Sequence, residues 1–454
     1  MIARLLIPLA IALAACTPVP QGDTATRAVI SESTLPPMKT FAARAPDTLP
    51  VSNRDLARDF MSLSFQMESG RELVYFTRFE GPITLRVTGK PAATFMPDLR
   101  NLLARLSAEA GINIQITSAA DANITINSVK RTAIQRVLPQ AACFVAPNVT
   151  TLQEFRSARR SPKTNWATLQ TRTRIGIFIP NDSSPQEVRD CLHEEIAQSL
   201  GPLNDLYRLP NSVFNDDNVH TVLTSFDMLI LKATYAPELK SGMTQAEVAA
   251  RLPAIYARIN PRGRALPETP ASPTPISYAR AIQRALGPGA SPTARRAAAD
   301  QAIRIATRSG WTDNRRAFAH YAKGRLLQPV DSEAANRQYL IADSFYARSR
   351  QTRLHRAYVA TQLSAYQLSS GNIEQARVIA ARNISAARAG QNAALLSTLQ
   401  LLTAQALEAQ GRVSEARKLR LDSLGWARYG FGSDWAVRSK MREISTLTPA
   451  KPPA

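Results

Sequence analysis

The stretch SSPQEVRDCLHEEIAQSLGPLND, residues 183–205, decides the fold because it encodes one complete helix together with its start and stop signals. Ser184 is a typical N-cap residue, Pro185 suits the first helical position, and Glu187 completes a capping box. Gly201 is expected to end the helix in the left-handed conformation. An apolar stripe repeats every four residues and predicts one buried face: Val188, Leu192, Ile196 and Leu200.

The polar side of this helix has the spacing of a metal site. Two histidines four residues apart on a helix can bind one zinc ion, and the glutamate beside the first acts as general base. Here Glu194 and Gln198 are four residues apart, and Glu195 follows Glu194. His193 is out of register, because its i+4 neighbour is Ala197. The helix therefore offers oxygen ligands where zinc prefers nitrogen or sulfur.

This pattern resembles the motif of the metzincin-type zincins, which continues past the second histidine to a glycine and a third ligand. With the glycine aligned to Gly201, Glu194 and Gln198 occupy the two histidine positions, and Glu195 occupies the position of the base. Asn204, followed by Asp205, occupies the position of the third ligand.

Two downstream segments continue the resemblance. NSVFND (211–216) is similar to the turn that places a methionine beneath the metal, with Phe214 in its place, and residues 223–237 resemble the helix that follows. The chain is similar to an uncharacterised family of bacterial lipoproteins with a zincin-like domain of unknown function.

The resemblance implies a degenerate, catalytically inactive metalloprotease-like domain, a pseudoenzyme, with no metal, cofactor or catalytic residue assigned. In this interpretation the side chains of Glu194, Glu195, Gln198, Asn204 and Asp205 hydrogen-bond one another and the backbone in the former cleft. Two alternatives stay open. Glu194, Gln198, Asn204 and Asp205 could bind calcium, which accepts carboxylates and amide carbonyls. A metal-dependent peptidase or other hydrolase could use Glu195 as general base.

The N-terminus indicates export. Residues 1–15 are predicted to form a signal peptide, with Arg4 before an apolar run too short to span a bilayer. Leu13–Cys16 resembles a bacterial lipobox, so we expect Cys16 to be acylated and to anchor the protein in the cell envelope. Thr17 after the cysteine favours the outer membrane, facing the periplasm. Residues 16–52, rich in Pro, Thr, Ser and Ala, are expected to form a flexible tether.

Two cysteines remain for the folded part. In an oxidising compartment, Cys143 and Cys191 are expected to form a disulfide; two buried free thiols are the alternative.

The remaining chain predicts an α+β fold followed by an all-α region. Strand patterns at 72–79, 82–89, 111–117, 123–129 and 174–180 intermix with a helix containing Leu99, Leu102, Leu103 and Leu106. The predicted zincin-like domain covers 53–260, a Pro-rich linker 261–275, a helical-repeat domain 276–445 and a tail 446–454.

The second part repeats with a period of 40 residues. SSGNIEQARVIAARNI (369–384) aligns with AQGRVSEARKLRLDSL (409–424), and a weaker copy places Ala335 about 41 residues before Ala376. Each unit predicts a helix pair, which resembles a tetratricopeptide-type solenoid. Trp311, Trp426 and Trp435 are expected to be packing residues between helices.

The charge is concentrated in the helical part. From residue 276 onward there are 27 Lys and Arg against 11 Asp and Glu, which is +16 of the total +21. With an envelope address, the expected partners are a protein or envelope component bound by the repeats and the membrane through the lipid anchor, but no nucleic acid. The alternatives are arginines that only solvate helix faces and a helical bundle that binds nothing further. The sequence thus predicts a lipid-anchored periplasmic binding or scaffold protein.

Overall fold

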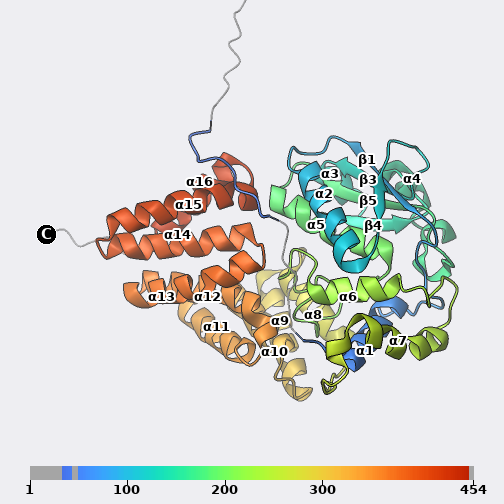
Figure 1. Ribbon diagram of the computed structural model, residues 1–454. Helices are drawn as coiled ribbons and strands as arrows, with labels where there is room; N and C mark the ends of the chain where they lie inside the picture. Colours follow the sequence, from blue (N-terminus) through green and yellow to red (C-terminus); the bar gives the residue numbers. More distant parts are fainter. Residues whose placement is uncertain (1–32, 43–49, 449–454) are drawn as a thin grey trace, which may run out of the picture. The chain divides into compact units, whose positions relative to one another are not determined.

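The computed structural model describes residues 33–42 and 50–448 (Figure 1). The predicted signal peptide and Cys16 lie outside the described residues. From Leu35 onward the described chain belongs to one compact unit, so the predicted division into domains at 260 and 276 stays a prediction. No helix in the described ranges has the length and apolar character needed to cross a membrane.

A five-stranded sheet forms the centre of the first region. The strand order is β2-β1-β3-β5-β4, with neighbours parallel except β4, which is antiparallel to β5. The strands are β1 (Ile83–Gly89), β2 (Ile114–Ile116), β3 (Ile124–Val129), β4 (Phe144–Pro147) and β5 (Ile175–Pro180). With the helices around it, this sheet confirms the α+β class. The predicted strands at 82–89, 123–129 and 174–180 are present.

Two strand predictions are corrected. Residues 72–79 form no strand of the sheet; the segment bonds to the loop after α6 instead, with Phe76 N donating to Met243 O. Its apolar pattern comes from Phe76 and Phe79, which are buried in the core. The segment 111–117 contributes only the short strand β2, whose Gln115 and Ile116 are exposed because β2 is an edge strand. Strand β4 went unpredicted, since four residues carry too little pattern.

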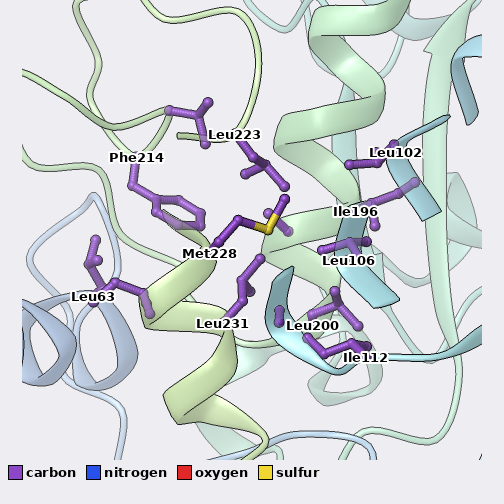
Figure 2. Close-up of a cluster of buried hydrophobic side chains, with 14 of the residues drawn as sticks. Leu63, Leu102, Leu106, Ile112, Ile196, Leu200, Phe214, Leu223, Met228 and Leu231 are labelled. Atoms are coloured by element: carbon purple, nitrogen blue, oxygen red, sulfur yellow. The ribbon is translucent and has the colours of Figure 1, made fainter. Parts of the chain in front are cut away.

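Seven α-helices accompany the sheet. They are α1 (Asn53–Phe65), α2 (Phe95–Arg105), α3 (Arg131–Gln135), α4 (Leu152–Ala158), α5 (Pro185–Leu200), α6 (Ser225–Thr234) and α7 (Gln245–Ile259). A π-helical turn, Leu106–Ala110, extends α2, and short 3-10 turns lie at 162–164, 166–168 and 261–263. The apolar stripe of α5 is fully buried, and Figure 2 shows Ile196 and Leu200 packed among Leu102, Leu106 and Met228.

The ends of α5 follow the sequence signals in part. Ser184 is the N-cap and accepts a hydrogen bond from Glu187 N, with Pro185 in the first turn. The expected capping box is incomplete, because the Glu187 carboxylate pairs with Arg131. Gly201 is not left-handed: its φ is −178°. Glycine is needed there for space, since a Cβ would lie 2.7 Å from Cγ2 of Thr234.

The second region is entirely helical. It contains α8 (Ile276–Leu286), α9 (Pro292–Arg308), α10 (Asn314–Leu327), α11 (Ser332–Tyr346), α12 (Arg353–Ser369), α13 (Ile373–Ala389), α14 (Ala393–Ala409), α15 (Val413–Phe431) and α16 (Asp434–Ser445). Helices α14 and α15 begin 40 residues after α12 and α13 respectively. The period is therefore 40, and successive helices from α8 to α15 pack on one another.

Matching residues occupy matching places in the repeat. Gly371 and Gly411 end the first helix of each pair with φ of 78° and 79°, a conformation that favours glycine. Ala376 and Ala416 are buried on the second helix of each pair, as is Ala335 on α11. Small side chains at these positions allow close packing of the helices.

Part of the predicted tether packs on the helical region. Lys39 N donates to Gly425 O on α15, and the Phe41 ring stacks on Trp426 with ring centroids 4.5 Å apart. This end of the segment therefore contacts α15, and the flexibility expected of residues 16–52 stays a prediction. Trp311 and Trp426 are buried as expected, but the prediction for Trp435 is wrong, because its side chain is 73% exposed.

The disulfide prediction is confirmed: Cys143 and Cys191 are bonded, with their Cα atoms 6.0 Å apart. The bridge ties the middle of α5 to the residue before β4.

Because this bridge closes a loop over a sequence separation of 48, replacing both cysteines with alanine should lower the free energy of unfolding by about 4 kcal/mol on the loop-entropy model. Urea denaturation of the oxidised protein, the reduced protein and the double variant measures this. Coinciding curves for oxidised and reduced wild type would contradict the prediction.

Candidate functional site

Helix α5 is the structural basis of the site. Twelve of its sixteen residues are buried, and it contacts β4, β5, α2, α6 and α15. A buried arginine caps its C-terminal end: the Arg172 guanidinium donates to the carbonyl oxygens of Gln198 and Gly201 and to Thr77 Oγ1. A cation at this end is favourable because the last carbonyls of a helix carry partial negative charge.

The N-terminal half of α5 is attached to the helical region. Gln186 Nε2 donates to Asn392 Oδ1 at 3.1 Å, and Ala394 N donates to Gln186 Oε1 at 2.9 Å. The Arg189 guanidinium lies 5.2 Å from the centre of the Tyr429 ring. These contacts fix the rotation of α5 and so the direction of its polar residues.

His193, the one histidine in the motif, bonds to the loop before α6. His193 is buried, and its Nδ1 accepts a hydrogen bond from Leu223 N at 3.2 Å, just before α6. The imidazole therefore holds the loop that precedes α6.

The segment after α5 runs along α1. Leu203 N donates to Leu63 O, and Asn204 Nδ2 donates to Ser62 O at 2.9 Å. These bonds bring Asp205 to the end of α1, close to Glu68. Leu206 N donates to Phe214 O, which draws the next loop to the same place.

Three carboxylates meet there, and we call Glu68, Asp205 and Asp216 the carboxylate cluster. One oxygen from each lies within 4.8 Å of the others. Glu68 is exposed, and the two aspartates are partly buried. None of the ion pairs found in the described part of the chain joins the cluster to a lysine or arginine. The cluster is thus a concentration of negative charge at the boundary between the interior and water.

The two glutamates of α5 belong to the same electrostatic environment. Burial, and then the charges of Glu68 and Asp216, raise the pKa of Glu194 to about 7. Burial, and then Glu194 and Glu68, raise the pKa of Glu195 well above its usual value. Glu195 is only 3% exposed, and its Oε2 has no hydrogen-bond partner.

The pKa values of the two aspartates in the cluster are also raised. Burial, and then Glu68 and Asp217, raise the pKa of Asp216 to about 7. Burial, and then Glu68 and Glu194, raise the pKa of Asp205 well above its usual value. These groups therefore repel one another when ionised, and each favours the protonated form of its neighbours.

The loop that carries Asp216 is tied down on both sides. Asp227 on α6 accepts hydrogen bonds from Val213 N, Thr224 N and the Ser212 hydroxyl. On the other side, buried Asp217 bonds to His355 Nε2 on α12 at 2.9 Å. The acidic loop is therefore attached directly to the helical region.

A cleft of about 1070 Å³ opens beside the cluster. Its lining includes three acidic residues, Glu68, Asp216 and Asp217, and three arginines from α8 and α10, Arg280, Arg284 and Arg325, which we call the arginine wall. Aromatic side chains also line the cleft: Tyr207, Phe318, Tyr321, Tyr346 and Tyr358. A ligand in this cleft can therefore meet both signs of charge and aromatic rings.

Some of the residues predicted from the sequence lie at or near the cluster, and others contact different elements. Asp205 joins the cluster, and Glu194 and Glu195 sit near enough for the charges to interact. Asn204 donates to α1, and Gln198 is buried near the capped end of α5. The bond of Asn204 to the Ser62 carbonyl oxygen agrees with the expected bonding to the backbone, and the hydrogen bonding expected among these side chains stays a prediction.

Sequence reasoning missed Glu68, Asp216 and the pair formed by Asp217 and His355. Asp216 and Asp217 had a weak signal, as neighbouring acids in a turn-rich stretch. Glu68 and His355 had none, because their roles depend on segments distant in the chain.

The raised pKa values predict a pH-dependent stability. Glu194 ionises near pH 4 when unfolded and near pH 7 when folded, so the folded state holds the extra proton between these values and loses stability as pH rises through the window. Between pH 5 and pH 7.5, the free energy of unfolding of Glu194→Gln should fall by about 1 to 2 kcal/mol less than that of wild type. The difference is smaller than the full pKa shift implies, because Glu194 is partly solvated.

Urea denaturation in the presence of a chelator gives the measurement, and exposed Glu333→Gln is the matched control. Equal pH dependence in wild type and Glu194→Gln would show that Glu194 titrates normally.

The comparisons with known proteins give a family for the first region alone. No curated protein and no solved structure matches the chain. Residues 53–254, from the start of α1 to the middle of α7, match the family model described as "Protein of unknown function (DUF2927)", so this region is a DUF2927 domain.

Proposed function

We propose that this chain is a non-catalytic binding protein of the bacterial cell envelope, anchored through an acylated Cys16 and facing the periplasm from the outer membrane. Its partner binds in the cleft between the DUF2927 domain and the helical region. The observation that carries the proposal is the cleft itself, whose lining combines acidic residues, arginines and aromatic side chains.

The lining residues suggest the chemistry of the partner. The acidic residues attract ammonium or guanidinium groups, and the arginines attract carboxylates or phosphates. Tyrosine side chains offer apolar faces together with hydroxyl groups. A peptide segment that carries both charges satisfies all three surfaces.

The finer interpretation of the domain, a degenerate zincin-like fold, is part of this proposal. Its support is the order of elements: α5 follows β5, and Phe214 and then α6 follow α5. Phe214 is fully buried beside Met228 (Figure 2). The expected ligand positions carry Glu194, Gln198 and Asn204 in place of histidines.

Two features favour binding over hydrolysis. His193 Nδ1 accepts a hydrogen bond from Leu223 N, which helps to orient the imidazole. Burial raises the pKa of Glu195, which favours the protonated form of the group that a hydrolase would use as general base.

The helical region supplies the second surface of the proposal. Its stacked helix pairs resemble tetratricopeptide-like repeats, which bind proteins, although its period of 40 exceeds the 34 residues usual for that repeat. The packing of residues 35–42 on α15 illustrates how an extended segment lies on these helices.

A photo-crosslinking experiment in intact cells tests the cleft. A crosslinking amino acid at Gln283, which is exposed and lines the cleft, should give a discrete adduct, while one at exposed Glu333 on α11 should not. Reversing the arginine wall with Arg280→Glu and Arg284→Glu should reduce the adduct at least about tenfold, since each lost ionic contact costs about 1 kcal/mol or more.

Arg417→Glu with Lys418→Glu, an equal charge reversal on exposed α15 residues, is the control and should leave the adduct intact. An adduct that survives reversal of the arginine wall would place the partner elsewhere. A hydrolytic activity lost in Glu195→Gln would favour the enzyme instead.

The anchor has a separate test. Cys16→Ala should move the protein from the membrane fraction to the soluble periplasmic fraction, because acyl chains contribute about 0.8 kcal/mol per buried methylene. Fractionation at high salt removes proteins held only by charge. Continued membrane association of Cys16→Ala at high salt would argue against lipid anchoring.

A further inference from the structure

We propose that a second pocket, at the start of α12, binds a phosphate monoester. This pocket has a volume of about 740 Å³. It shares no lining residue with the cleft described above. The site is therefore independent of the partner proposed for the cleft.

The charged residues that line this pocket are all basic. Arg350, Arg353 and Arg388 line it, and its described lining contains no aspartate or glutamate. Arg350 and Arg353 are exposed, and their guanidinium groups form no ion pair or hydrogen bond with the residues that the structure describes. Arg388 lies 3.9 Å from Asp422, which partly compensates its charge. The pocket thus keeps two guanidinium charges without a counter-ion.

The start of α12 adds backbone donors to these charges. Arg350 begins a 3-10 turn, Arg350–Thr352, and Arg353 is the first residue of the seventeen-residue helix α12. The N-cap residue Thr352 makes no side-chain cap, because its hydroxyl donates to the carbonyl oxygens of Tyr346 and Ser349. The first N–H groups of α12 therefore lack the usual side-chain acceptor. The partial positive charge of a helix N-terminus favours an anion at this place.

A buried amide without a partner is the second, independent observation. Asn211 lines the pocket and is only 8% exposed. Its backbone carbonyl accepts from the Thr224 hydroxyl, but its side-chain amide bonds to no residue in the described part of the chain. Buried polar groups are rarely left in this state. An oxygen of a bound phosphate would accept a hydrogen bond from the amide nitrogen of Asn211.

Asn211 is held close to the start of α12 although it belongs to the first region. The carbonyl oxygen of its neighbour Pro210 bonds to His220 Nε2 at 3.0 Å. The His220 ring in turn lies edge-to-face with the ring of His355, in the first turn of α12, with ring centroids 6.0 Å apart. The amide, the two free arginines and the helix start therefore belong to one place in the folded chain.

The turn after α13 forms another side of the pocket and carries Arg388. A Cβ on Gly390 would lie 2.8 Å from both terminal carbons of Leu354, so this turn is in close contact with the first turn of α12. The Arg388 guanidinium lies 5.5 Å from the centre of the Trp426 ring, on which Phe41 stacks. The pocket thus has a basic part at α12 and an aromatic part beyond Arg388.

These features select the class of ligand. Guanidinium groups match phosphate oxygens with paired hydrogen bonds. A phosphate monoester carries about two negative charges at neutral pH, which matches the two uncompensated arginines, whereas a single carboxylate carries one. The pocket is larger than a phosphate group, and its aromatic part suits the organic portion of the ester. A soluble monoester and a lipid headgroup both offer this chemistry.

Isothermal titration of the purified full chain tests the site with phenyl phosphate, inorganic phosphate and succinate. Phenyl phosphate should bind at one site and more tightly than inorganic phosphate, and succinate should bind most weakly. Arg350→Gln with Arg353→Gln should weaken phenyl phosphate binding at least about tenfold, because two charged hydrogen-bonding groups are lost. Asn211→Asp should weaken it by a similar factor, because it replaces a donor with a negative charge.

The matched control removes the same charge elsewhere. Arg304 and Arg308 on α9 are also exposed and form no ion pair within the described ranges. Arg304→Gln with Arg308→Gln should therefore bind phenyl phosphate as wild type does. Thermal unfolding without ligand should be the same for both double variants and wild type, since none of the four guanidinium groups has a partner to lose.

Vesicles distinguish the two sources of the phosphate. Sedimentation with phosphatidic acid vesicles that is lost in Arg350→Gln with Arg353→Gln, but kept in the α9 control, would assign a lipid headgroup. Binding of the soluble probe without such sedimentation would assign a soluble monoester. The proposal is overturned if neither probe nor vesicle binds in a manner that depends on Arg350 and Arg353, or if succinate binds more tightly than phenyl phosphate.

Discussion

The enclosure of helix α5 is the constraint on which the rest of the structure depends. The helix has one apolar stripe, which a surface helix would bury against a single partner. Here β4, β5, α2, α6 and α15 surround it, so its polar side is enclosed as well. Some of these enclosed polar groups have hydrogen-bond partners: Arg172 caps the C-terminal carbonyls, and Gln186 bonds to the start of α14. Glu194 and Glu195 remain as carboxyl groups in surroundings that disfavour their charge.

The cleft combines charges from both regions. The DUF2927 domain contributes the acidic residues of its lining, and helices α8 and α10 contribute the arginines. Asp217 and His355 bridge the two regions in a buried pair. The excess positive charge of the helical region is thus partly directed at a local concentration of negative charge, although the arginines of the cleft and the carboxylate cluster form no ion pair among the residues that the structure describes.

Acidic residues from three separate segments meet near α5. Glu68 follows α1, Asp205 follows α5, and Asp216 lies on the loop before α6, with one oxygen from each within 4.8 Å of the others. Loops held by Asp227 and by the bonds along α1 keep these groups in place.

Local signals in the sequence determined the elements that depend on neighbouring residues: α5 with its N-cap at Ser184, the strands β1, β3 and β5, and the period of 40 marked by Gly371 and Gly411. They also indicated the disulfide, because only two cysteines remained for an oxidising compartment. Tertiary structure alone decided the rest. Residues 72–79 have the pattern of a strand but pair with a loop, and Gly201 serves the approach of Thr234 instead of a left-handed turn. The cluster, the pair of Asp217 with His355 and the cap from Arg172 all join residues far apart in the chain, and such contacts leave no periodicity in a single sequence.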